Sequence, residues 1–572
     1  MCVCVCYIRR FFGDTMANRK IGIYLTTALL VTSCGISSLE GLERGSKQFE
    51  DASFWLKSGQ ENLERILAMR KNERRAKNII IFIGDGMGMA SITTGRIFTG
   101  QAMGQTGEEY KLAFETFPNS AFSKTYNVDK QVPDSAGTAT AMFTGVKSRY
   151  KVIGFDGKVN YDDCDKVLNE ASKISSVANW AQATGMDTGF VTTTRITHAT
   201  PAALYAHVNN RDWECDSAIP LAHRDCIKDI ARQLVEDAPG NRFKVIMGGG
   251  GQNMGVPMNG PVDSESCTRR DRKNLAAFWE KNNPKGKFVN TSADLMSLDI
   301  GKTESILGIF SQSHMPYHAL RTSETPTLAN MTMQAIRLLK KYDKGFLLMV
   351  ESGKIDIAHH QNYAKLALRE VTALEEAVKA ALSQVDTKET LIIVTADHSH
   401  AFTMNGYPSR GNDILGFAND LYVPGRKPYE TLTYANGPGF FHHRNNASTN
   451  INETWIPVEN ETDRADPFYR SLATFYLKDE THGGEDVGVY AIGPWSHLFR
   501  GTFEQNYIAH VIAYAGCFKD WPSHCNSPYN RYFYELTNSS GTNYSVFSLY
   551  LSLLAAAGVA SSIALIANSR LT

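Results

Sequence analysis

Apolar runs separated by amphipathic stretches are the main regularity of this 572-residue chain. Between the runs, apolar positions recur at helical spacing, most clearly over residues 362–382. Strands that alternate with helices predict an α/β fold with a mainly parallel central sheet and helices on both faces. The five runs that are typical of buried strands span residues 78–83, 188–194, 243–247, 345–350 and 390–395.

An apolar segment near the start has the layout of a secretory signal. It begins at Met16, carries Arg19 and Lys20, and continues with an apolar run and then small residues. The run is short for a stable membrane span. We therefore expect residues 1–34 to be a leader, with translation starting at Met16 or at Met1.

The other end is also apolar, from Val546 almost to the last residue. Two interpretations compete, a transmembrane helix and a cleaved signal for a glycosylphosphatidylinositol (GPI) anchor. No cluster of Lys or Arg flanks the tail, and small residues precede it, which favours a GPI signal over residues 538–572. The candidate attachment residues are Asn538, Ser539 and Ser540.

Composition agrees with a secreted globular protein. Lys plus Arg and Asp plus Glu number 59 each, so the charge balance gives no reason to expect nucleic-acid binding. Secretion predicts disulfides and glycans. Outside the leader six cysteines remain, which suits three bridges but allows fifteen pairings: Cys164, Cys215, Cys226, Cys267, Cys517 and Cys525. Acceptor tripeptides for N-glycans begin at Asn290, Asn330, Asn446, Asn452, Asn460, Asn538 and Asn543.

Candidate ligands follow the predicted strands. In a parallel sheet the ligand site lies beyond the carboxyl ends of the strands. One Asp or His there can cap a helix or satisfy a loop amide, but this many together indicate a metal site. Mixed His and carboxylate ligands suit zinc, and oxygen ligands alone suit magnesium. The residues are Asp85, His198, Thr200, Glu351, Asp356, His359, His360, Asp397, His398, His400 and, before a later strand-like run, His482.

The segment "QVPDSAGTATAMFTG" (131–145) has two interpretations. Asp134 or Ser135 caps a helix that begins near Ala136, because a short oxygen side chain accepts from free N–H groups. Alternatively, the helix N-terminus holds an anion, and the Ser135 hydroxyl attacks a phosphate. Both can hold together.

Several long motifs resemble the metazoan alkaline phosphatases. They are "NIIIFIGDGMG", "VPDSAGTATA", "TTTRITHATPAALYAHVNNRDW", "ADHSHAF" and "THGGEDV", in the family's order between about residues 51 and 525. The resemblance implies zinc- and magnesium-dependent hydrolysis of phosphate monoesters at alkaline pH through a phosphoserine. It also implies a homodimer held by a GPI lipid on the outer face of the plasma membrane.

Carried over residue by residue, the resemblance implies two Zn²⁺ and one Mg²⁺ per subunit. Ser135 would be the nucleophile, and Arg211 would hold two phosphate oxygens. His198 and His400 would lie near the magnesium and the zinc pair without binding them. The ligand sets would be Asp356, His360 and His482 for one zinc, Asp85, Asp397 and His398 for the other, and Asp85, Thr200 and Glu351 for magnesium.

The family's disulfides imply Cys164–Cys226 and Cys517–Cys525, which leaves Cys215 and Cys267 for an additional bridge. Residues 407–474 resemble the family's crown insertion. Residues 53–70 form either a helix packed on its own domain or an arm that crosses the homodimer.

The family's calcium site matches poorly. Phe310 fits and Glu265 is a loose candidate, but Ser311 and Thr325 stand where acidic residues are expected. A calcium site is therefore doubtful.

Three other functions are open to such a chain. A surface binding protein would keep the fold without catalysis. A phosphodiesterase usually has a Thr nucleophile and lacks the Arg, and a sulfatase has a modified Cys or Ser in a different motif. Ser135 together with Arg211 favours phosphate monoesters.

Overall fold

A ten-stranded sheet forms the centre of the molecule, with strand order β17-β2-β16-β8-β1-β7-β3-β4-β6-β5. The computed structural model describes residues 50–258, 267–418, 429–444, 464 and 466–518. All neighbouring strands are parallel except at β16, which runs antiparallel to β2 and β8. The bounds are β1 (Asn78–Gly84), β2 (Asn119–Lys124), β3 (Asp187–Arg195), β4 (Val245–Gly249), β5 (Gly286–Val289), β6 (Ser305–Ile309), β7 (Phe346–Ser352), β8 (Thr390–Ala396), β16 (Val487–Ile492) and β17 (Thr502–Glu504).

The predicted fold class is confirmed, and the five predicted strands are β1, β3, β4, β7 and β8. Strand β4 begins two residues later than predicted, because Phe243 instead ends a short 3₁₀ helix. Strands β2, β5, β6 and β17 were not predicted. They are short, and β2 alternates buried and exposed positions instead of forming a continuous apolar run.

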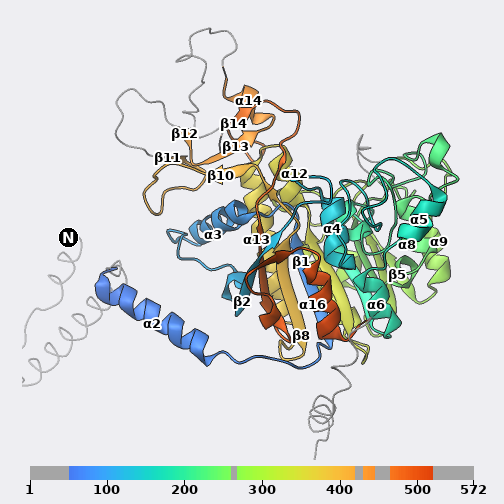
Figure 1. The fold of residues 1–572 in the computed structure, drawn as a ribbon, viewed down its shortest axis with the longest axis horizontal. Helices are drawn as coiled ribbons and strands as arrows, with labels where there is room; N and C mark the ends of the chain where they lie inside the picture. The colour runs from blue at the N-terminus through green and yellow to red at the C-terminus, as the bar shows by residue number, and fades with distance from the viewer. Residues whose placement is uncertain (1–49, 259–266, 419–428, 445–463, 465, 519–572) are drawn as a thin grey trace, which may run out of the picture. The chain divides into compact units, whose positions relative to one another are not determined.

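Helices cover both faces of the sheet (Figure 1). On β1, Ile79, Ile81 and Ile83 belong to one core cluster, whereas Ile80 and Phe82 belong to the other. This alternation follows from the two-residue period of a strand. The first cluster includes α4 (Ser135–Thr144), α6 (Val177–Ala183), α8 (Ile230–Glu236), α9 (Leu275–Asn282) and α16 (Tyr507–Gly516). The second includes α3 (Met89–Ala102), α11 (Leu328–Leu339) and α13 (Ala364–Leu382).

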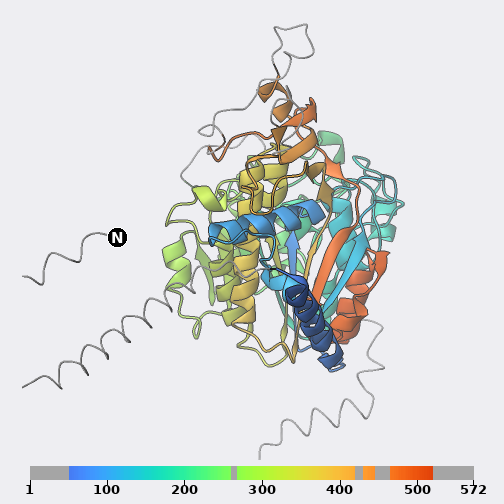
Figure 2. The ribbon, with the colours of Figure 1, turned by 90° about the vertical axis from the view of Figure 1, so that its left-hand side faces the viewer.

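A small sheet lies beyond one end of the main sheet (Figures 1 and 2). It contains β10 (Phe402–Met404), β13 (Leu432–Asn436) and β14 (Ala473–Phe475), with β11 (Phe417–Ala418) and β12 (Tyr429–Glu430) pairing beside it. Its apolar side packs on α3 and α13. Most of this region falls within the predicted insertion 407–474, although β10 precedes it. The insertion's boundaries stay a prediction.

Short helices complete the described fold. They are α5 (Lys166–Ser172), α7 (Ala199–Ala202), α10 (Ser292–Met296), α12 (Lys354–His360) and α14 (Gly439–His442). Of the predicted glycan acceptors, Asn290 is exposed directly after β5. Asn330 lies in the first turn of α11, and the Thr332 of its tripeptide is buried. The other five acceptors lie outside the described residues.

Helix α2 (Ala52–Ala68) belongs to a separate compact unit that ends at Arg70. The Asp51 side chain caps it by accepting from the Phe54 N–H at 2.9 Å. Packing on its own domain and crossing a dimer both stay predictions. No helix among the described residues is both long and apolar enough to cross a membrane. The predicted leader and the GPI signal lie outside these residues.

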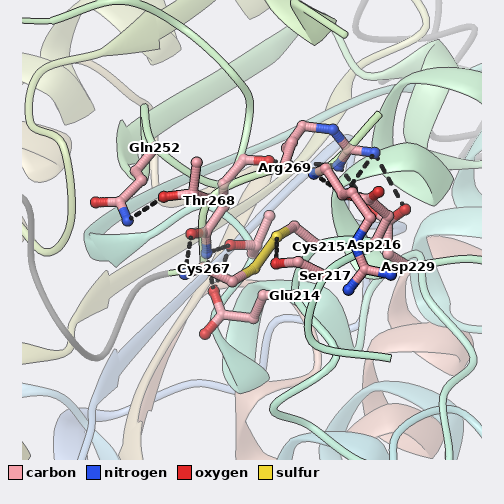
Figure 3. Close-up of a disulfide and its surroundings, with 12 residues drawn as sticks. Glu214, Cys215, Asp216, Ser217, Asp229, Gln252, Cys267, Thr268 and Arg269 are labelled. Atoms are coloured by element: carbon pink, nitrogen blue, oxygen red, sulfur yellow. Dashed lines mark hydrogen bonds and ion pairs between the residues drawn. A yellow bond between two sulfur atoms is a disulfide. The ribbon is translucent and has the colours of Figure 1, made fainter. Parts of the chain in front are cut away.

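Two disulfides join pairs of described residues. One bridge links Cys164 to Cys226 and the other links Cys215 to Cys267, with Cα–Cα distances of 6.2 and 6.1 Å. Beside the Cys215–Cys267 bridge, Arg269 Nη1 lies 2.9 Å from Asp229 Oδ1 and forms an ion pair with it (Figure 3). Cys525 lies outside the described residues, so the Cys517–Cys525 bridge stays a prediction.

The doubtful calcium site gains no support. Glu265 lies outside the described residues. The Ser311 hydroxyl donates to the His314 carbonyl at 2.9 Å, and the Phe310 N–H donates to the Gly248 carbonyl.

Candidate active site and metal centre

The carboxyl ends of the central strands bring the predicted ligands together. Asp85 follows β1, Glu351 lies near the end of β7, and Asp397 and His398 follow β8. These four side chains are fully buried. Since β7, β1 and β8 are neighbours in register, their ends meet at one place, as the sequence predicted.

Asp356, His360 and His482 form a cluster that we call the nitrogen group. Asp356 Oδ1 lies 3.3 Å from Nε2 of both histidines, and the two Nε2 atoms are 3.1 Å apart. Asp356 and His360 share one face of α12 because they are four residues apart. Three donor atoms this close can share one ion.

Asp85, Asp397 and His398 form the central group. His398 Nε2 lies 3.3 Å from Asp397 Oδ2 and 3.5 Å from Asp85 Oδ1. The Gly86 N–H donates to Asp397 Oδ1 at 3.0 Å. Gly86 has φ of +69°, and an added Cβ would overlap the His400 ring, so only glycine fits this turn.

Asp85, Thr200 and Glu351 form the oxygen group. Three of its buried atoms have no hydrogen-bond partner of normal geometry among the described residues: Asp85 Oδ2, Thr200 Oγ1 and Glu351 Oε1. His198 contributes a nitrogen to the same cluster, closer than the sequence implied. Buried oxygen atoms without partners are costly, so this arrangement fits a bound hard cation.

The Ser135 hydroxyl lies beside the central group. Its Oγ is 3.2 Å from His398 Nε2 and 3.4 Å from Asp85 Oδ1. Ser135 is the first residue of α4, so its hydroxyl lies at the positive end of the helix dipole. A phosphoryl group at this helix N-terminus would therefore be stabilised.

The predicted cap role falls to Asp134 and not to Ser135. Asp134 has an extended backbone, and its carboxylate accepts from the N–H groups of Ala136 and Gly137 at 3.2 and 3.3 Å. The helix therefore begins one residue earlier than expected. The Ser135 hydroxyl is left directed at the metal-ligand cluster.

Arg211 extends over the same helix terminus. Its Nη1 pairs with Asp134 Oδ2 at 3.2 Å, and its Nη2 lies 3.0 Å from His198 Nε2. Burial, with the charges of Arg211 and Arg195, lowers the pKa of His198 well below its usual value. His198 is thus a neutral imidazole that accepts from the guanidinium.

Glu480 is a site residue that the sequence analysis missed. Its Oε2 pairs with His400 Nδ1 at 2.5 Å, and its carbonyl accepts from His360 Nδ1 at 2.5 Å. His400 Nε2 in turn lies 2.8 Å from Asp356 Oδ1. An acidic residue two positions before His482 was the available signal.

His359 lies behind these histidines. Its Nε2 contacts the Ser91 hydroxyl at 2.9 Å, and its Nδ1 contacts the Tyr434 hydroxyl at 2.8 Å. It is fully buried. Among the described residues no ligand cluster includes it, so its place is structural.

Electrostatics favour divalent cations at these clusters. Burial raises the pKa of Asp85 well above its usual value, and the neighbouring Asp397 and Asp356 carboxylates raise it further. Burial also raises the pKa of Glu351 to about 7. Buried like charges this close oppose one another, and bound cations reverse that cost. The mixed imidazole and carboxylate donors suit divalent metal ions.

Comparison with known proteins agrees with this geometry. The alkaline phosphatase family model matches residues 76–518. The chain is 48% identical over 509 residues to alkaline phosphatase 4 of Drosophila melanogaster, covering 84% of each chain. It is 40% identical over 480 residues to the membrane-bound alkaline phosphatase of Bombyx mori, covering 82% of this chain and 86% of that one.

A solved structure shares the fold. The alkaline phosphatase of Thermus thermophilus superimposes with a TM-score of 0.54 at 20% identity, covering 79% of this chain and 93% of that one. The family model matches most of the chain, and the relatives are well above 30% identical over the same region. Together these matches assign the chain to one family. The chain belongs to the alkaline phosphatase family.

Proposed function

We propose that this protein hydrolyses phosphate monoesters at alkaline pH through a phosphoserine at Ser135. The observation that carries the proposal is the Ser135 hydroxyl, placed at a helix N-terminus within 3.4 Å of two metal-donor side chains. A serine hydroxyl is a weak nucleophile near neutral pH and needs such activation.

We assign two Zn²⁺ and one Mg²⁺ to the three groups. The nitrogen group and the central group would each hold zinc, and the oxygen group would hold magnesium. Their donors fit these metals because histidine nitrogens favour zinc and oxygen-rich sets favour magnesium. When bound, the metals would lower the pKa of the serine hydroxyl and offset negative charge on the phosphoryl group.

The chain's own residues direct the first half of the reaction. Ser135 Oγ attacks phosphorus and loses its proton to solvent. The bond from phosphorus to the ester oxygen breaks, and the leaving oxygen gains a proton from solvent. Arg211 pairs with two phosphoryl oxygens through its planar guanidinium, and the positive end of the α4 dipole stabilises the same charge.

The second half restores the enzyme. Water attacks phosphorus, the bond to Ser135 Oγ breaks, and the serine oxygen regains a proton as phosphate departs. Arg211 holds the phosphoryl group in both halves, because Asp134 and His198 fix its two terminal nitrogens. This bidentate pairing favours monoesters, which expose enough free phosphoryl oxygens for Arg211 and the helix terminus together.

A catalytically silent binding protein is the alternative. It would tolerate loss of the nucleophile, the arginine or a ligand. The chain retains Ser135, Arg211 and all eight proposed ligands, so we favour the enzyme.

We also propose a cellular setting for this activity. The protein would enter the secretory route and be held on the outer face of the plasma membrane by a GPI lipid, as a glycosylated homodimer. Support comes from the signal-like segments at both ends, the relative named as membrane-bound, and the two disulfides.

The experiment is hydrolysis of an aryl phosphate at alkaline pH, before and after chelation and after return of Zn²⁺ and Mg²⁺. We expect chelation to abolish turnover and the two metals together to restore it. Ser135→Ala should lower kcat by at least about 10³-fold, whereas the control Ser383→Ala, at the exposed end of α13, should not. Normal turnover by Ser135→Ala, or a folded metal-loaded wild type without turnover, would refute the proposal.

A further inference from the structure

Lys151 connects the nucleophile's helix to the phosphate-binding arginine through its backbone. Its N–H donates to Asp134 Oδ1 at 2.8 Å, and Asp134 precedes Ser135. Its carbonyl accepts from the Arg211 N–H at 3.0 Å. Lys151 therefore has a fixed position at the rim of the phosphate site.

This fixed position is a strained one. Lys151 has φ of +62°, in the left-handed region where glycine and asparagine are at ease and lysine is uncommon. Such conformations persist only where surrounding contacts enforce them, and they gather at functional sites. The two backbone hydrogen bonds supply the enforcement here. They do not explain why the residue is a lysine.

The ammonium of Lys151 lies among aromatic rings at the mouth of the site. Its Nζ is 5.8 Å from the Tyr150 ring centroid and 5.7 Å from the Tyr161 ring centroid. Lys130 Nζ lies 5.9 Å from the Tyr150 ring, which is therefore flanked by two cations. Asn210 Nδ2 donates to the Tyr161 hydroxyl at 3.3 Å and fixes that ring.

Tyr150 shows that this rim borders the phosphate site. Burial raises the pKa of its hydroxyl, and the charges of Asp134, Arg211 and Asp212 also act on that pKa. The backbone of the next residue, Lys151, bonds to both Asp134 and Arg211, so Tyr150 lies near the residue before the nucleophile and near the phosphate-binding arginine.

Asp212 offsets this cation only in part. Its carboxylate is 3.8 Å from Lys151 Nζ, beyond a normal hydrogen bond, and the side chains are 62% and 31% exposed. Exposed pairs of this kind contribute little, so an incoming anion can compete for the ammonium. Hydrolysis itself, as proposed above, uses no atom of the Lys151 side chain.

We propose that Lys151 selects phosphate monoesters whose leaving group carries a second negative charge close to the ester. The inference rests on the proposed function, because Arg211 must hold the phosphoryl group to place the leaving group at this rim. Two opposite charges several ångströms apart near a protein surface change binding by about three- to tenfold. Salt should reduce that preference, because exposed charges are screened.

The test uses three small alkyl phosphates that differ in the charge beside the ester. Phosphoglycerate carries a carboxylate, glycerol phosphate a hydroxyl, and phosphoethanolamine an ammonium. We expect Lys151→Gln to lower kcat/KM about three- to tenfold for phosphoglycerate, to change it less than twofold for glycerol phosphate, and to raise it for phosphoethanolamine. Asp212→Asn should shift the preference in the opposite direction.

Two further variants separate selection from a structural role. Lys151→Asn removes the charge but suits the left-handed backbone, so its Tm should equal or exceed that of the wild type while the preference is lost. Lys130→Gln is the matched control, since Lys130 contacts the same ring without a backbone link to Asp134. It should change the preference less than Lys151→Gln does.

Outcomes distinguish this inference from the proposed function. If the wild type hydrolyses an aryl phosphate but the ratio of the three substrates is the same in Lys151→Gln and Lys151→Asn, the inference is wrong and the function stands. An equal fall for all three substrates would also overturn it. Absence of aryl phosphate turnover in the metal-loaded wild type would refute the function itself.

Discussion

The nitrogen group and the oxygen group lie side by side but are held in different ways. Two members of the oxygen group come directly from ends of core strands, and the hydroxyl of Thr192 on β3 donates to Glu351 behind them. The nitrogen group draws on a short helix and on the chain around His482. Of its two histidines, His360 donates through Nδ1 to the Glu480 carbonyl and His482 donates through Nδ1 to the Pro133 carbonyl. Glu480 lies in a segment between β14 and β15 (His482–Gly483).

This difference shows that the two groups of ligands in one site depend on different parts of the fold. The two carboxylates of the oxygen group are in place once the parallel sheet has formed, because they are at adjacent strand ends, and Thr200 is added by the short helix α7 that follows β3. The nitrogen group needs a further segment, distant in sequence, to pack over the sheet's edge. The geometry of the nitrogen group is therefore the more sensitive to changes outside the sheet.

Asp85 gives the largest expected effect, because it belongs to both the central and the oxygen group. Asp85→Asn should lose zinc from the central group and magnesium together, and kcat/KM should fall by at least about 10³-fold, since several kcal/mol of charge stabilisation disappear. Metal analysis of the purified variant and aryl phosphate kinetics measure both. The exposed Asp299→Asn serves as the control and should behave as the wild type.

Retained zinc with loss of magnesium alone would contradict this expectation. Asp85 would then serve only the oxygen group, and the two groups would be independent. That outcome would sharpen the contrast between them.

The partners behind the ligands give the second prediction. Glu480→Gln should raise the Zn²⁺ concentration needed for half-maximal activity by about 10–100-fold, with the Mg²⁺ requirement unchanged, because the Glu480 carboxylate pairs with His400, whose other ring nitrogen contacts Asp356 of the nitrogen group. Thr192→Val should raise the Mg²⁺ concentration needed for half-maximal activity and leave the Zn²⁺ requirement unchanged. Titration of each chelated variant with one metal, in excess of the other, measures the two requirements. If both variants shift both requirements equally, the two groups are coupled.

The sequence predicted which side chains gather at the strand ends because these ends are marked locally. An apolar run followed by Asp85 between two glycines predicts both the end of a strand and a carboxylate in a tight turn. The four-residue spacing of Asp356 and His360 predicts that both lie on one face of a helix. The resemblance to a known family then supplied the grouping, which spacing alone left open.

What the sequence left out depends on long-range contacts. Glu480 pairs with His400, eighty residues earlier, and its position two residues before His482 is the one local mark that separates it from an exposed acid. The choice of Asp134 over Ser135 as helix cap depends on backbone angles that composition does not fix. The placement of Lys151 depends on a left-handed residue that only the structure reveals.

A substitution of Glu370, which is buried on α13, is expected to give the smallest effect. It tests what burial alone does to a carboxylate, apart from metal binding. Glu370 lies behind the oxygen group, where the Ser352 hydroxyl donates to its carbonyl at 3.3 Å and its side chain accepts from the His318 N–H at 2.5 Å. Burial raises the pKa of Glu370 to about 7, as it does that of Glu351. Glu351 belongs to a proposed metal site, but Glu370 does not.

The raised pKa fixes the sign of a stability change with pH. Between about 4.5 and 7 the folded protein binds more protons at Glu370 than the unfolded chain, so its stability falls as pH rises through this window. The charged, buried form above pH 7 costs on the order of 3 kcal/mol relative to the neutral form below pH 4.5. Glu370→Gln keeps an acceptor for the His318 N–H and removes this cost.

We therefore expect Glu370→Gln to be more stable than the wild type by about 1–3 kcal/mol at pH 9, and equally stable near pH 4.5. Denaturant unfolding at both pH values measures the difference, with the exposed Glu389→Gln as the control. The gain should persist after chelation, because no metal compensates the charge at Glu370. A gain that appears only in the metal-loaded protein would mean that Glu370 is linked to the oxygen group, and the separation between buried acids with and without a cation would fail.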